Sequence, residues 1–480
     1  MTFQSKKPTR LLSLVILGLA CIWPFQGAHA NHEVRGIEGQ TFWLYAYPFQ
    51  IGLPEGSSMY MWGFGDLMRG SQANRAAGAG YSMPQYPGPT LIVTEGQPVT
   101  INLINYGVPD TVNVMIPGQA ITANGGTEGL FTRGARRGQM VSYSFTPTEP
   151  GTYLYHSIGD KNPGLHQEMG LVGALIVRPS DYDPTADATR TAYGNGTETD
   201  FDQEYLYLLT EMDPGVHKQM ERGHYQHFTN SDRFAKIWFV NGRVFPDLFQ
   251  GDFNRLFPHQ PYESLARSRP GDRVLVRLVN TGLDSHPFHF HGENLRFIAR
   301  DGQMLSSDGV TANLGRSDNT VNSAPKQIVD AIWTWTGKDL NWDIFGPVDT
   351  GCTDANNNMA DDGSEAGPND EWVMCHDDTC VDDDNDGFDD TNHEYCADHG
   401  KALPVTIPGS GELAFGGWWS GSPYLGDTGG LPPGEGGLNP YGGYFFVWHS
   451  HAEKELTTFD IFPGGTLSAV VVLPPYVEID

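Results

Sequence analysis

Apolar and polar residues alternate in short runs along most of this chain of 480 residues. Alternation with a period of two is typical of β-strands that bury one face, and turns rich in Gly and Pro separate the runs. Between residues 38 and 178 the pattern predicts six strands: 41–46, 90–93, 99–103, 141–145, 153–156 and 171–177. A composition with 59 Gly, 33 Pro and 12% aromatic residues also suits a loop-rich, all-β protein.

Two parts of this pattern recur later in the chain and in the same order. Residues 95–107 are echoed by 270–282, and residues 151–157 are echoed by 444–450. Each copy has a turn, an alternating strand and a closing aromatic strand that carries a histidine, which is the plan of a Greek-key β-sandwich. We therefore expect two sandwich domains and a linker between them, at residues 31–180, 204–480 and 181–203, respectively.

The N-terminus carries the features of an export signal. Lys6, Lys7 and Arg10 precede an apolar run, and the small-residue segment 28–30 follows it, which predicts a secretory signal over residues 1–30. The run is too short to span a bilayer, and we expect no transmembrane segment. The formal net charge of −29 would become −32 without the signal, which argues against nucleic acid as a partner. We expect a protein that is secreted, periplasmic or at the cell surface.

An acidic segment, residues 343–401, interrupts the second predicted sandwich and contains every cysteine of the mature chain. In an exported protein, four cysteines in a short segment with few apolar residues imply two disulfides, for which three pairings exist. A zinc site with four thiolates is the alternative. The cysteines are Cys352, Cys375, Cys380 and Cys396.

Part of this acidic segment follows the spacing of an EF-hand calcium loop. Alternating carboxylates come first, Gly387 stands at the sharp turn, and a further carboxylate occupies the ninth position. His393 stands at the twelfth position, where such loops have a bidentate Glu, and Glu394 follows one place late. The calcium ligands that we predict are Asp382, Asp384, Asp386 and Asp390. A solvated acidic loop without an ion is the alternative.

Two histidine pairs provide the strongest chemical signal in the sequence. His289 and His291 lie two residues apart on a predicted strand, so their side chains share one face, and His449 and His451 repeat this spacing. Four neutral imidazoles are a ligand set that suits copper, zinc or iron. The alternative is two hydrogen-bonded polar clusters in the core, in which each buried imidazole needs a partner.

A third histidine group, formed by His217, His224 and His227, lies early in the second predicted sandwich. Its spacing fits neither one face of a strand nor one face of a helix. We expect a solvated loop at these residues rather than a set of metal ligands.

The histidine pairs and their neighbours resemble the third and fourth copper motifs of the multicopper oxidases. Residues 285–292 contain the histidine triplet of the third motif, and residues 448–451 resemble the His-Cys-His run of the fourth. The resemblance implies two cupredoxin domains, copper as the cofactor and an oxidoreductase activity. It also implies roles for the histidines: type 1 copper for His286, type 2 for His289, and type 3 for His291, His449 and His451.

Other positions depart from the family pattern. Residues 115–118 stand where the first motif has two histidines, and the second motif keeps only His156, so five of eight cluster histidines remain. Ser450 replaces the type 1 cysteine, while Glu455 and Asp460 replace its second histidine and its axial methionine. A serine hydroxyl cannot replace the thiolate that makes copper blue, so we expect copper that is not blue.

Copper nitrite reductases offer a second and more distant resemblance. Residues 113–117 line up with their Asn-Val-Asp-Phe-His segment, but Met115 and Pro117 replace the catalytic Asp and its nearby His. Ser157 stands at the cysteine of that family, with His166 nine residues later. We therefore do not expect nitrite reductase chemistry.

Three functions are compatible with these observations. The first is a copper-dependent oxidoreductase of multicopper oxidase type that acts on metal ions or small-molecule reductants. The second is copper sequestration or delivery without turnover, and the third is a surface structural protein with vestigial copper ligands. A homo-oligomer is compatible with the sequence, but every copy would lack the same histidines.

Overall fold

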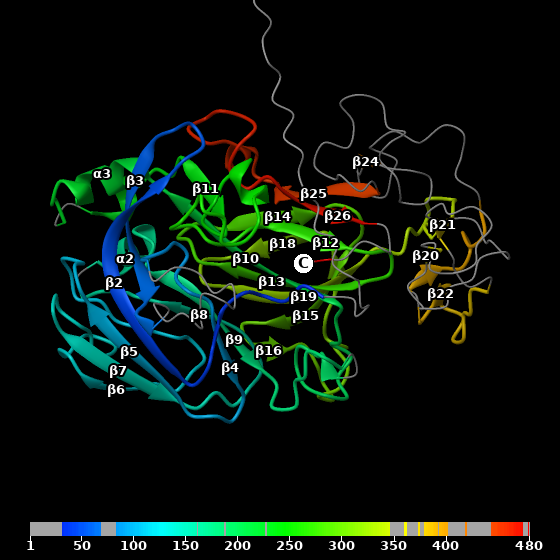
Figure 1. Cartoon of the computed structure of the whole chain (residues 1–480), viewed down its shortest axis with the longest axis horizontal. Helices are drawn as coiled ribbons and strands as arrows, with labels where there is room; N and C mark the ends of the chain where they lie inside the picture. Colours follow the sequence, from blue (N-terminus) through cyan, green and yellow to red (C-terminus); the bar gives the residue numbers. More distant parts are fainter. Residues whose placement is uncertain are drawn as a thin grey trace, which may run out of the picture.

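The computed structural model of the chain describes the following residues: 31–68, 83–160, 162–186, 189–225, 228–345, 360–361, 373–374, 379–391, 393–401, 418–419, 443–473 and 479. They form two β-sandwiches that lie against each other, the first in blue and cyan and the second mainly in green (Figure 1). The prediction of an all-β fold with two sandwiches is confirmed. The predicted signal sequence lies outside the described residues.

The first sandwich consists of a four-stranded and a five-stranded sheet. The strand order is β1-β4-β9-β8 in one and β3-β2-β5-β7-β6 in the other. The six strands predicted in this part of the chain are all present. The bounds are β1 (Ile37–Glu38), β2 (Thr41–Gly52), β3 (Ser58–Asp66), β4 (Leu91–Thr94), β5 (Val99–Asn105), β6 (Thr122–Gly125), β7 (Met140–Phe145), β8 (Gly151–His156) and β9 (Val172–Arg178).

The second sandwich has a seven-stranded and a six-stranded sheet. The main path of one is β11-β10-β13-β19-β15-β16, with β17 beside β15, and that of the other is β12-β26-β25-β14-β18, with β24 beside β25. The bounds are β10 (Gln203–Met212), β11 (Ile237–Val240), β12 (Leu265–Ser268), β13 (Arg273–Asn280), β14 (His286–Phe290), β15 (Leu295–Arg300), β16 (Gln303–Met304), β17 (Ser317–Asp318), β18 (Thr320–Ser323), β19 (Ile328–Thr334), β24 (Trp418–Trp419), β25 (Tyr444–Ser450) and β26 (Ser468–Val472).

The two sandwiches repeat the same strand pairings, as the sequence repeat predicts. β2 runs parallel to β5, and β10 runs parallel to β13. β4 runs parallel to β9, and β12 to β26, while β8 and β25 pair antiparallel with β9 and β26. The repeated segments 151–157 and 444–450 therefore occupy equivalent places in the two sheets.

Alternating burial along β14 and β25 decides which side chains face the core of the second sandwich. Phe288 and Phe290 on β14, and Phe446 and Trp448 on β25, are fully buried among aromatic and aliphatic residues. The residues between them are only partly buried. Because strand side chains alternate between faces, these partly buried positions point away from the core.

Buried charges link the two sandwiches. Glu204 on β10 accepts hydrogen bonds from Arg178 of the first sandwich and from Arg277 of the second, each at 2.6 Å. Burial would raise the pKa of Glu204, but the two guanidinium groups lower it well below its usual range. Breaking such a pair would leave an uncompensated buried charge, so these residues specify how the two sandwiches meet. The predicted linker also packs in place, because Phe201 is buried there.

Short helices and the acidic segment complete the structure. The helices are α2 (Pro163–Glu168), α3 (Pro214–Glu221), η3 (Asn230–Asp232), η4 (Asp247–Phe249) and η6 (Glu453–Leu456). The described part of the acidic segment contains two short hairpins that lie at the right of Figure 1: β20 (Ala360–Asp361) with β21 (Val373–Met374), and β22 (Phe388–Asp389) with β23 (Glu394–Tyr395).

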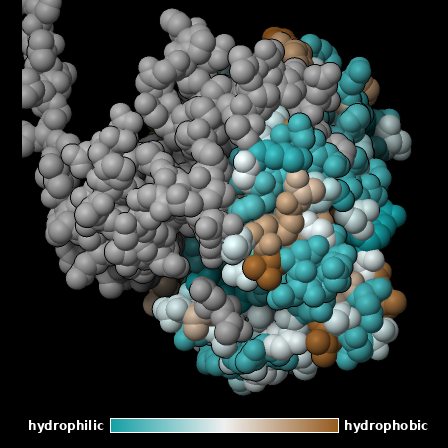
Figure 2. Space-filling model, turned by 90° about the vertical axis from the view of Figure 1, so that its right-hand side faces the viewer, coloured by the Kyte–Doolittle hydropathy of each residue, from teal (hydrophilic) through white to brown (hydrophobic). Residues whose placement is uncertain are grey.

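The described surface is mainly hydrophilic on one face of the molecule. Figure 2 shows a face on which hydrophilic residues predominate among those described, with only small hydrophobic patches between them. None of the helices that the structure describes combines the length and the apolar character needed to cross a membrane.

Candidate metal centre

The pairing of β14 with β25 brings the two predicted histidine pairs together. His289 lies directly opposite His449 in the antiparallel register, and the His451 backbone N–H donates to the Pro287 carbonyl at 2.7 Å. Directly opposed residues in a sheet place their side chains on the same face. Since this is the face that points away from the core, the imidazoles gather on the outer side of the sheet.

The four rings form one group, the histidine tetrad, which consists of His289, His291, His449 and His451. The centroid of the His289 ring lies 4.7 Å from that of His291 and 4.6 Å from that of His451. The His449 ring stacks on His291 at 5.2 Å and on His451 at 5.6 Å. Three of the residues are partly buried and His451 is exposed. Residues from two distant parts of the chain thus meet at one place.

Hydrogen bonds determine which ring nitrogens of the tetrad carry a proton. His449 Nδ1 lies 2.8 Å from the Ser450 carbonyl, which can only accept, so Nδ1 is protonated and Nε2 keeps its lone pair. The Thr320 hydroxyl donates to Asn319 Oδ1 and therefore accepts from His289 Nδ1 at 2.8 Å. Partners of this kind hold metal-binding imidazoles in one tautomer and one orientation.

Burial keeps two imidazoles of the tetrad, those of His289 and His449, uncharged. Partial burial lowers the pKa of His289 to about 4, with further contributions from the adjacent histidines. Burial also lowers the pKa of His449 to about 4, against a hydrogen bond to the Ser450 carbonyl that raises it. Both imidazoles are therefore neutral at pH 7, and the neutral form is the one that binds a metal.

One distance within the tetrad matches a metal site. His291 Nε2 and His449 Nε2 lie 3.1 Å apart as a hydrogen-bonded pair, in which His291 donates because His449 Nε2 keeps its lone pair, and a bound metal would take the place of this proton. Two nitrogens that are each about 2.0 Å from one ion have the same separation when the angle between them is about 100°. Among the described residues, the groups with three ligand atoms within 4.8 Å of one another do not include the tetrad. A third imidazole would therefore have to rotate toward an ion held between His291 and His449. A donor set of imidazoles without sulfur fits copper in a non-blue form.

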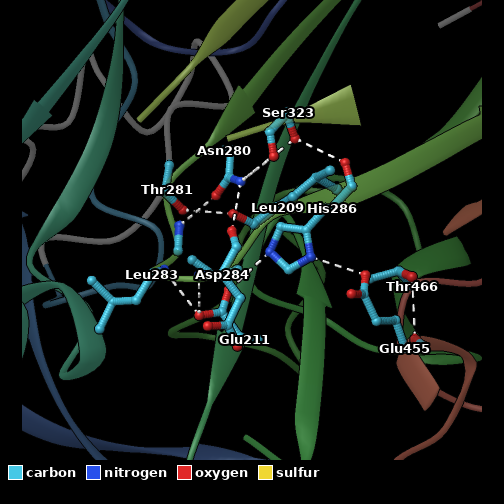
Figure 3. Close-up of polar contacts among 12 residues, drawn as sticks. Leu209, Glu211, Asn280, Thr281, Leu283, Asp284, His286, Ser323, Glu455 and Thr466 are labelled. Carbon is cyan, nitrogen blue, oxygen red and sulfur yellow. Dashed lines mark hydrogen bonds and ion pairs between the residues drawn. The ribbon is translucent and has the colours of Figure 1, made fainter. Parts of the chain in front are cut away.

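His286 lies on the same strand as the tetrad but on its inner face. Its side chain is 1% exposed, with Nδ1 2.9 Å from Glu455 Oε2 and Nε2 2.8 Å from Glu211 Oε2. Figure 3 shows the ring between these two carboxylates. Burial alone would lower the pKa of His286, but the two carboxylates raise it to about 9. An imidazolium whose two N–H groups both donate offers no lone pair to copper, so we place His286 outside the candidate site.

Glu211 extends this arrangement toward the first sandwich. Its carboxylate accepts hydrogen bonds from the backbone N–H groups of Leu283 and Asp284 at 2.9 and 3.0 Å (Figure 3). Arg233 pairs with Glu211 and also with Glu168 on α2. Charged side chains thus form a continuous line from β14 across the junction between the sandwiches. Sequence patterns did not indicate this line, because its members come from distant segments with no shared motif.

His217 corrects one expectation. The solvated loop predicted at residues 217–227 is wrong for His217, which is 1% exposed on helix α3. Val216 and Met220 pack with the core of the first sandwich, and His217 Nε2 lies 3.5 Å from Glu168 Oε1. Two apolar residues four positions apart were the signal for a helix at this point. His227 lies outside the described residues.

The first sandwich places Met115 opposite His156. Their backbones form an antiparallel bridge, with reciprocal hydrogen bonds of 2.9 and 3.0 Å. His156 is 3% exposed, and its Nδ1 has no hydrogen-bond partner among the described residues. Burial lowers the pKa of His156 to about 3, and the charge of Lys326 adds to this effect.

Ser157 follows the bridged residue His156 in the chain, and its side chain contacts His166. The Ser157 hydroxyl is 2.8 Å from His166 Nδ1 and accepts the Asn113 backbone N–H at 3.0 Å. His166 Nε2 is 3.3 Å from a carboxylate oxygen of Asp110. Protein groups therefore engage both nitrogens of His166, which leaves no ring nitrogen for a metal.

The acidic segment contains one described disulfide and one carboxylate cluster. Cys380 is bonded to Cys396, which excludes both from a site of four thiolates. Oxygens of Asp382, Asp384 and Asp386 lie within 4.8 Å of one another, while Asp390 is exposed and does not belong to this cluster. Cys352 and Cys375 lie outside the described residues.

Two sandwiches with histidines on a closing pair of strands define a cupredoxin-like protein. Residues 73–182 and 217–335 each match a profile described as multicopper oxidase. In both sandwiches, therefore, the chain is similar to multicopper oxidases.

Relatives that the chain matches share parts of its length. It is 34% identical over 100 residues to an L-ascorbate oxidase of Cucurbita maxima, a match that spans 20% of this chain and 16% of the relative. It is 23% identical over 257 residues to copper resistance protein A of Escherichia coli, which spans 46% of this chain and 38% of the relative. The chain therefore matches less than two fifths of the length of these relatives. A blue copper oxidase structure from Nitrosomonas europaea aligns with a TM-score of 0.49 and 15% identity, covering 91% of this chain and 86% of that one.

Proposed function

We propose that this protein binds copper at the histidine tetrad and acts as a non-blue copper oxidoreductase on metal ions or small-molecule reductants. The observation that carries the proposal is the tetrad itself: four imidazoles from two strands meet on the outer face of a sheet, and two of their nitrogens are 3.1 Å apart. Copper held there would supply one-electron redox chemistry. The matches of both sandwiches to multicopper oxidase profiles support copper as the metal.

The surroundings of His286 support a site without blue copper. Ser450 pairs with Phe288 on the core side of the two strands, where the family has its type 1 cysteine, and Ser450 is fully buried. Glu455 stands where the family has its second type 1 histidine, and its carboxylate binds His286. With a hydroxyl and a carboxylate at these positions, no sulfur is available to give the intense charge-transfer band of blue copper.

The exposure of the tetrad supports direct access by small reductants. His451 is exposed and the other three imidazoles are partly exposed, so a soluble reductant or a metal ion could approach without an internal electron relay. The same openness favours a second candidate function, copper sequestration or delivery, because an ion on an open face can pass directly to another ligand. Oxygen consumption distinguishes the two functions, since only the oxidoreductase consumes oxygen while it oxidises a reductant.

Copper loading with spectroscopy tests the site. The wild type should bind Cu(II) without turning blue and should show normal, type 2-like hyperfine splitting in electron paramagnetic resonance. The variant His289→Ala/His449→Ala should lose stoichiometric copper, because it removes one ligand from each pair. A blue wild type, or a double variant that keeps stoichiometric copper, would falsify the assignment.

Calcium binding at the acidic segment is a separate proposal. Asp382, Asp384 and Asp386 bring three carboxylate oxygens together, and Gly387 has the positive φ of +99° that the turn after them requires. His393 Nδ1 donates to the Gly271 carbonyl at 2.9 Å. Because Ca²⁺ takes oxygen ligands, the imidazole at the twelfth position does not supply the bidentate carboxylate of an EF-hand loop. We expect weak, extracellular-type affinity. Calorimetry should detect calcium in the wild type and none in Asp384→Asn/Asp386→Asn, with copper binding unchanged in both.

We propose that the protein is exported from the cytosol. Its destination is the periplasm, the cell surface or the extracellular medium. The Cys380–Cys396 disulfide supports it, because disulfides persist in oxidising compartments. Immunodetection of the protein in extracellular, periplasmic and cytosolic fractions tests this proposal.

A further inference from the structure

A small cavity lies where the segment before β1 crosses the second sandwich. It has a volume of about 30 Å³, and His32, Asp252 and Glu263 are among the residues that line it. One ligand atom from each of these three residues lies within 4.8 Å of the other two. A cavity of this size has room for an ion or a water molecule. None of the three residues belongs to the tetrad or to the acidic segment.

His32 is oriented as a metal ligand would be. It is 5% exposed, and its ring stacks on Tyr205 with the centroids 4.2 Å apart and the planes 10° from parallel. Its Nδ1 lies 2.7 Å from the Glu204 carbonyl, which can only accept, so Nδ1 carries the proton. Nε2 therefore keeps its lone pair, and it has no hydrogen-bond partner among the described residues. Burial lowers the pKa of His32, which keeps the ring neutral.

The carboxylates of Asp252 and Glu263 lie close together, and nearby positive charges offset their repulsion only in part. Asp252 Oδ1 accepts the Glu263 backbone N–H at 2.7 Å, and Glu263 pairs with Arg267 at 3.0 and 3.1 Å. Burial and the charge of Glu263 raise the pKa of Asp252 to about 6, although Arg243 and Arg35 oppose this rise. A cation between the carboxylates would relieve the repulsion.

We propose that His32, Asp252 and Glu263 form a second metal site, which takes a divalent ion of the zinc and manganese class. A neutral imidazole and two carboxylates provide three ligand atoms for a divalent ion, with Glu263 also paired to Arg267. One nitrogen and two oxygens suit Zn²⁺ or Mn²⁺, whereas Cu(I) prefers sulfur and Ca²⁺ prefers oxygen alone. The proposal does not depend on copper at the tetrad.

The position of this site gives the ion a structural role. The Glu204 backbone N–H donates to the His32 carbonyl at 2.9 Å, and the Val34 N–H donates to the Glu204 carboxylate at 3.1 Å. The same segment continues into β1, which pairs with β4 of the first sandwich. An ion bound to His32 and Asp252 would therefore join the edge of the first sandwich to a loop of the second. Hydrogen exchange of the amides between residues 32 and 37 should become slower when the ion binds.

Zinc titration of the full chain tests the site. The background is His289→Ala/His449→Ala, so that the tetrad does not contribute, and bound Zn²⁺ is counted by elemental analysis after dialysis. Adding Asp252→Asn should remove one equivalent of Zn²⁺ and abolish the rise in Tm that Zn²⁺ causes. Asn at this position can still accept the Glu263 N–H, so the fold is preserved. Asp247→Asn is the matched control, because it makes the same charge change near Arg243 and lies outside the three-residue group; it should keep the zinc.

A second variant tests whether Asp252→Asn loses zinc only because it disturbs the structure. His32→Phe keeps an aromatic ring to stack on Tyr205 but removes Nε2, and it should lose the same equivalent of Zn²⁺. If both variants bind as much Zn²⁺ as the background, or if the background binds none at this site and its Tm does not change, the proposal is wrong. Competition by Mn²⁺ for the same equivalent would identify the class of ion. Neither outcome affects the copper test, which relies on the tetrad alone.

Discussion

The same strand pair has different chemistry in the two sandwiches. In the second, His289 faces His449, and two further imidazoles extend the group along the outer face of the sheet. In the first, Met115 faces His156, and the imidazole is buried with a pKa of about 3. Both sandwiches have the same backbone pairing at this point, so the identity of the side chains determines whether a metal can bind there. One imidazole beside a thioether is not a site for a hard or borderline ion.

The core side of each strand pair shows a second difference. In the first sandwich the Ser157 hydroxyl binds His166, whereas in the second two carboxylates bind His286. Both arrangements occupy the imidazole with protein groups. Only the second sandwich has buried charged groups at this position, namely His286 and its two carboxylate partners. The stability of that sandwich should therefore depend on pH. The outer face therefore carries the candidate chemistry, and the inner face serves the structure.

Removing the tetrad should have the largest effect. The change His289→Ala/His449→Ala should weaken Cu(II) binding by about a thousandfold or more, which corresponds to about 4 kcal/mol. The matched change in the first sandwich, Met115→Ala/His156→Gln, should leave the affinity unchanged. Calorimetric titration measures both. Equal losses in the two variants would show that copper binds between the sandwiches, and the contrast drawn above would then fail.

The His286 arrangement should make stability depend on pH. The pKa of His286 is about 9 in the folded chain and about 6.5 in the unfolded chain, so its contribution is present below pH 6.5 and lost as the pH rises through 9. The difference corresponds to about 3 kcal/mol in the free energy of unfolding. Glu455→Gln should reduce stability at pH 6.5 and have little effect at pH 10. Denaturant unfolding at the two pH values would contradict the prediction if the variant lost as much at pH 10 as at pH 6.5.

Copper affinity should respond to acid and not to base. His289 and His449 both have a pKa of about 4, so protons compete with copper only as the pH falls toward that value. Protonation of these two imidazoles should lower the affinity by about a hundredfold at pH 3, about tenfold from each. An affinity that is the same at pH 5 and at pH 3 would show that His289 and His449 do not bind the metal. Electron paramagnetic resonance of Cu(II) at each pH separates the two cases.

The smallest effect should come from Thr320, which orients a tetrad ring without binding the metal. Thr320→Val removes the hydroxyl that accepts from His289 Nδ1, and copper affinity should fall about tenfold, as for other partners of metal-binding histidines. Thr320→Ser keeps the hydroxyl and should restore the affinity. His449 has a backbone carbonyl in this role, so no side-chain replacement can remove its partner. Failure of the Ser variant to restore binding would point to lost packing instead.

Local sequence patterns were sufficient for the fold and for the shared face of each histidine pair. Alternation predicted six of the nine strands described in the first sandwich, and the repeat of 151–157 at 444–450 predicted two sandwiches with equivalent closing strands. The spacing of His289 and His291 is a property of the strand itself, because side chains two residues apart share a face. The missing sulfur at Ser450 was likewise visible in the sequence, and so was a cysteine-rich segment of which the structure describes one disulfide.

Tertiary structure decided the partners of the remaining polar groups. His286 is a metal ligand in the resembling motif, yet Glu211, some 75 residues away, and Glu455, some 169 residues away, bind both of its nitrogens. His217 was placed in a solvated loop by its spacing and lies instead in a helix against the first core. His32 and Asp252 meet only because the segment before β1 crosses the second sandwich. A buried polar atom must find a partner wherever the folded chain supplies one, and no local pattern contains the distance between residues so far apart in sequence.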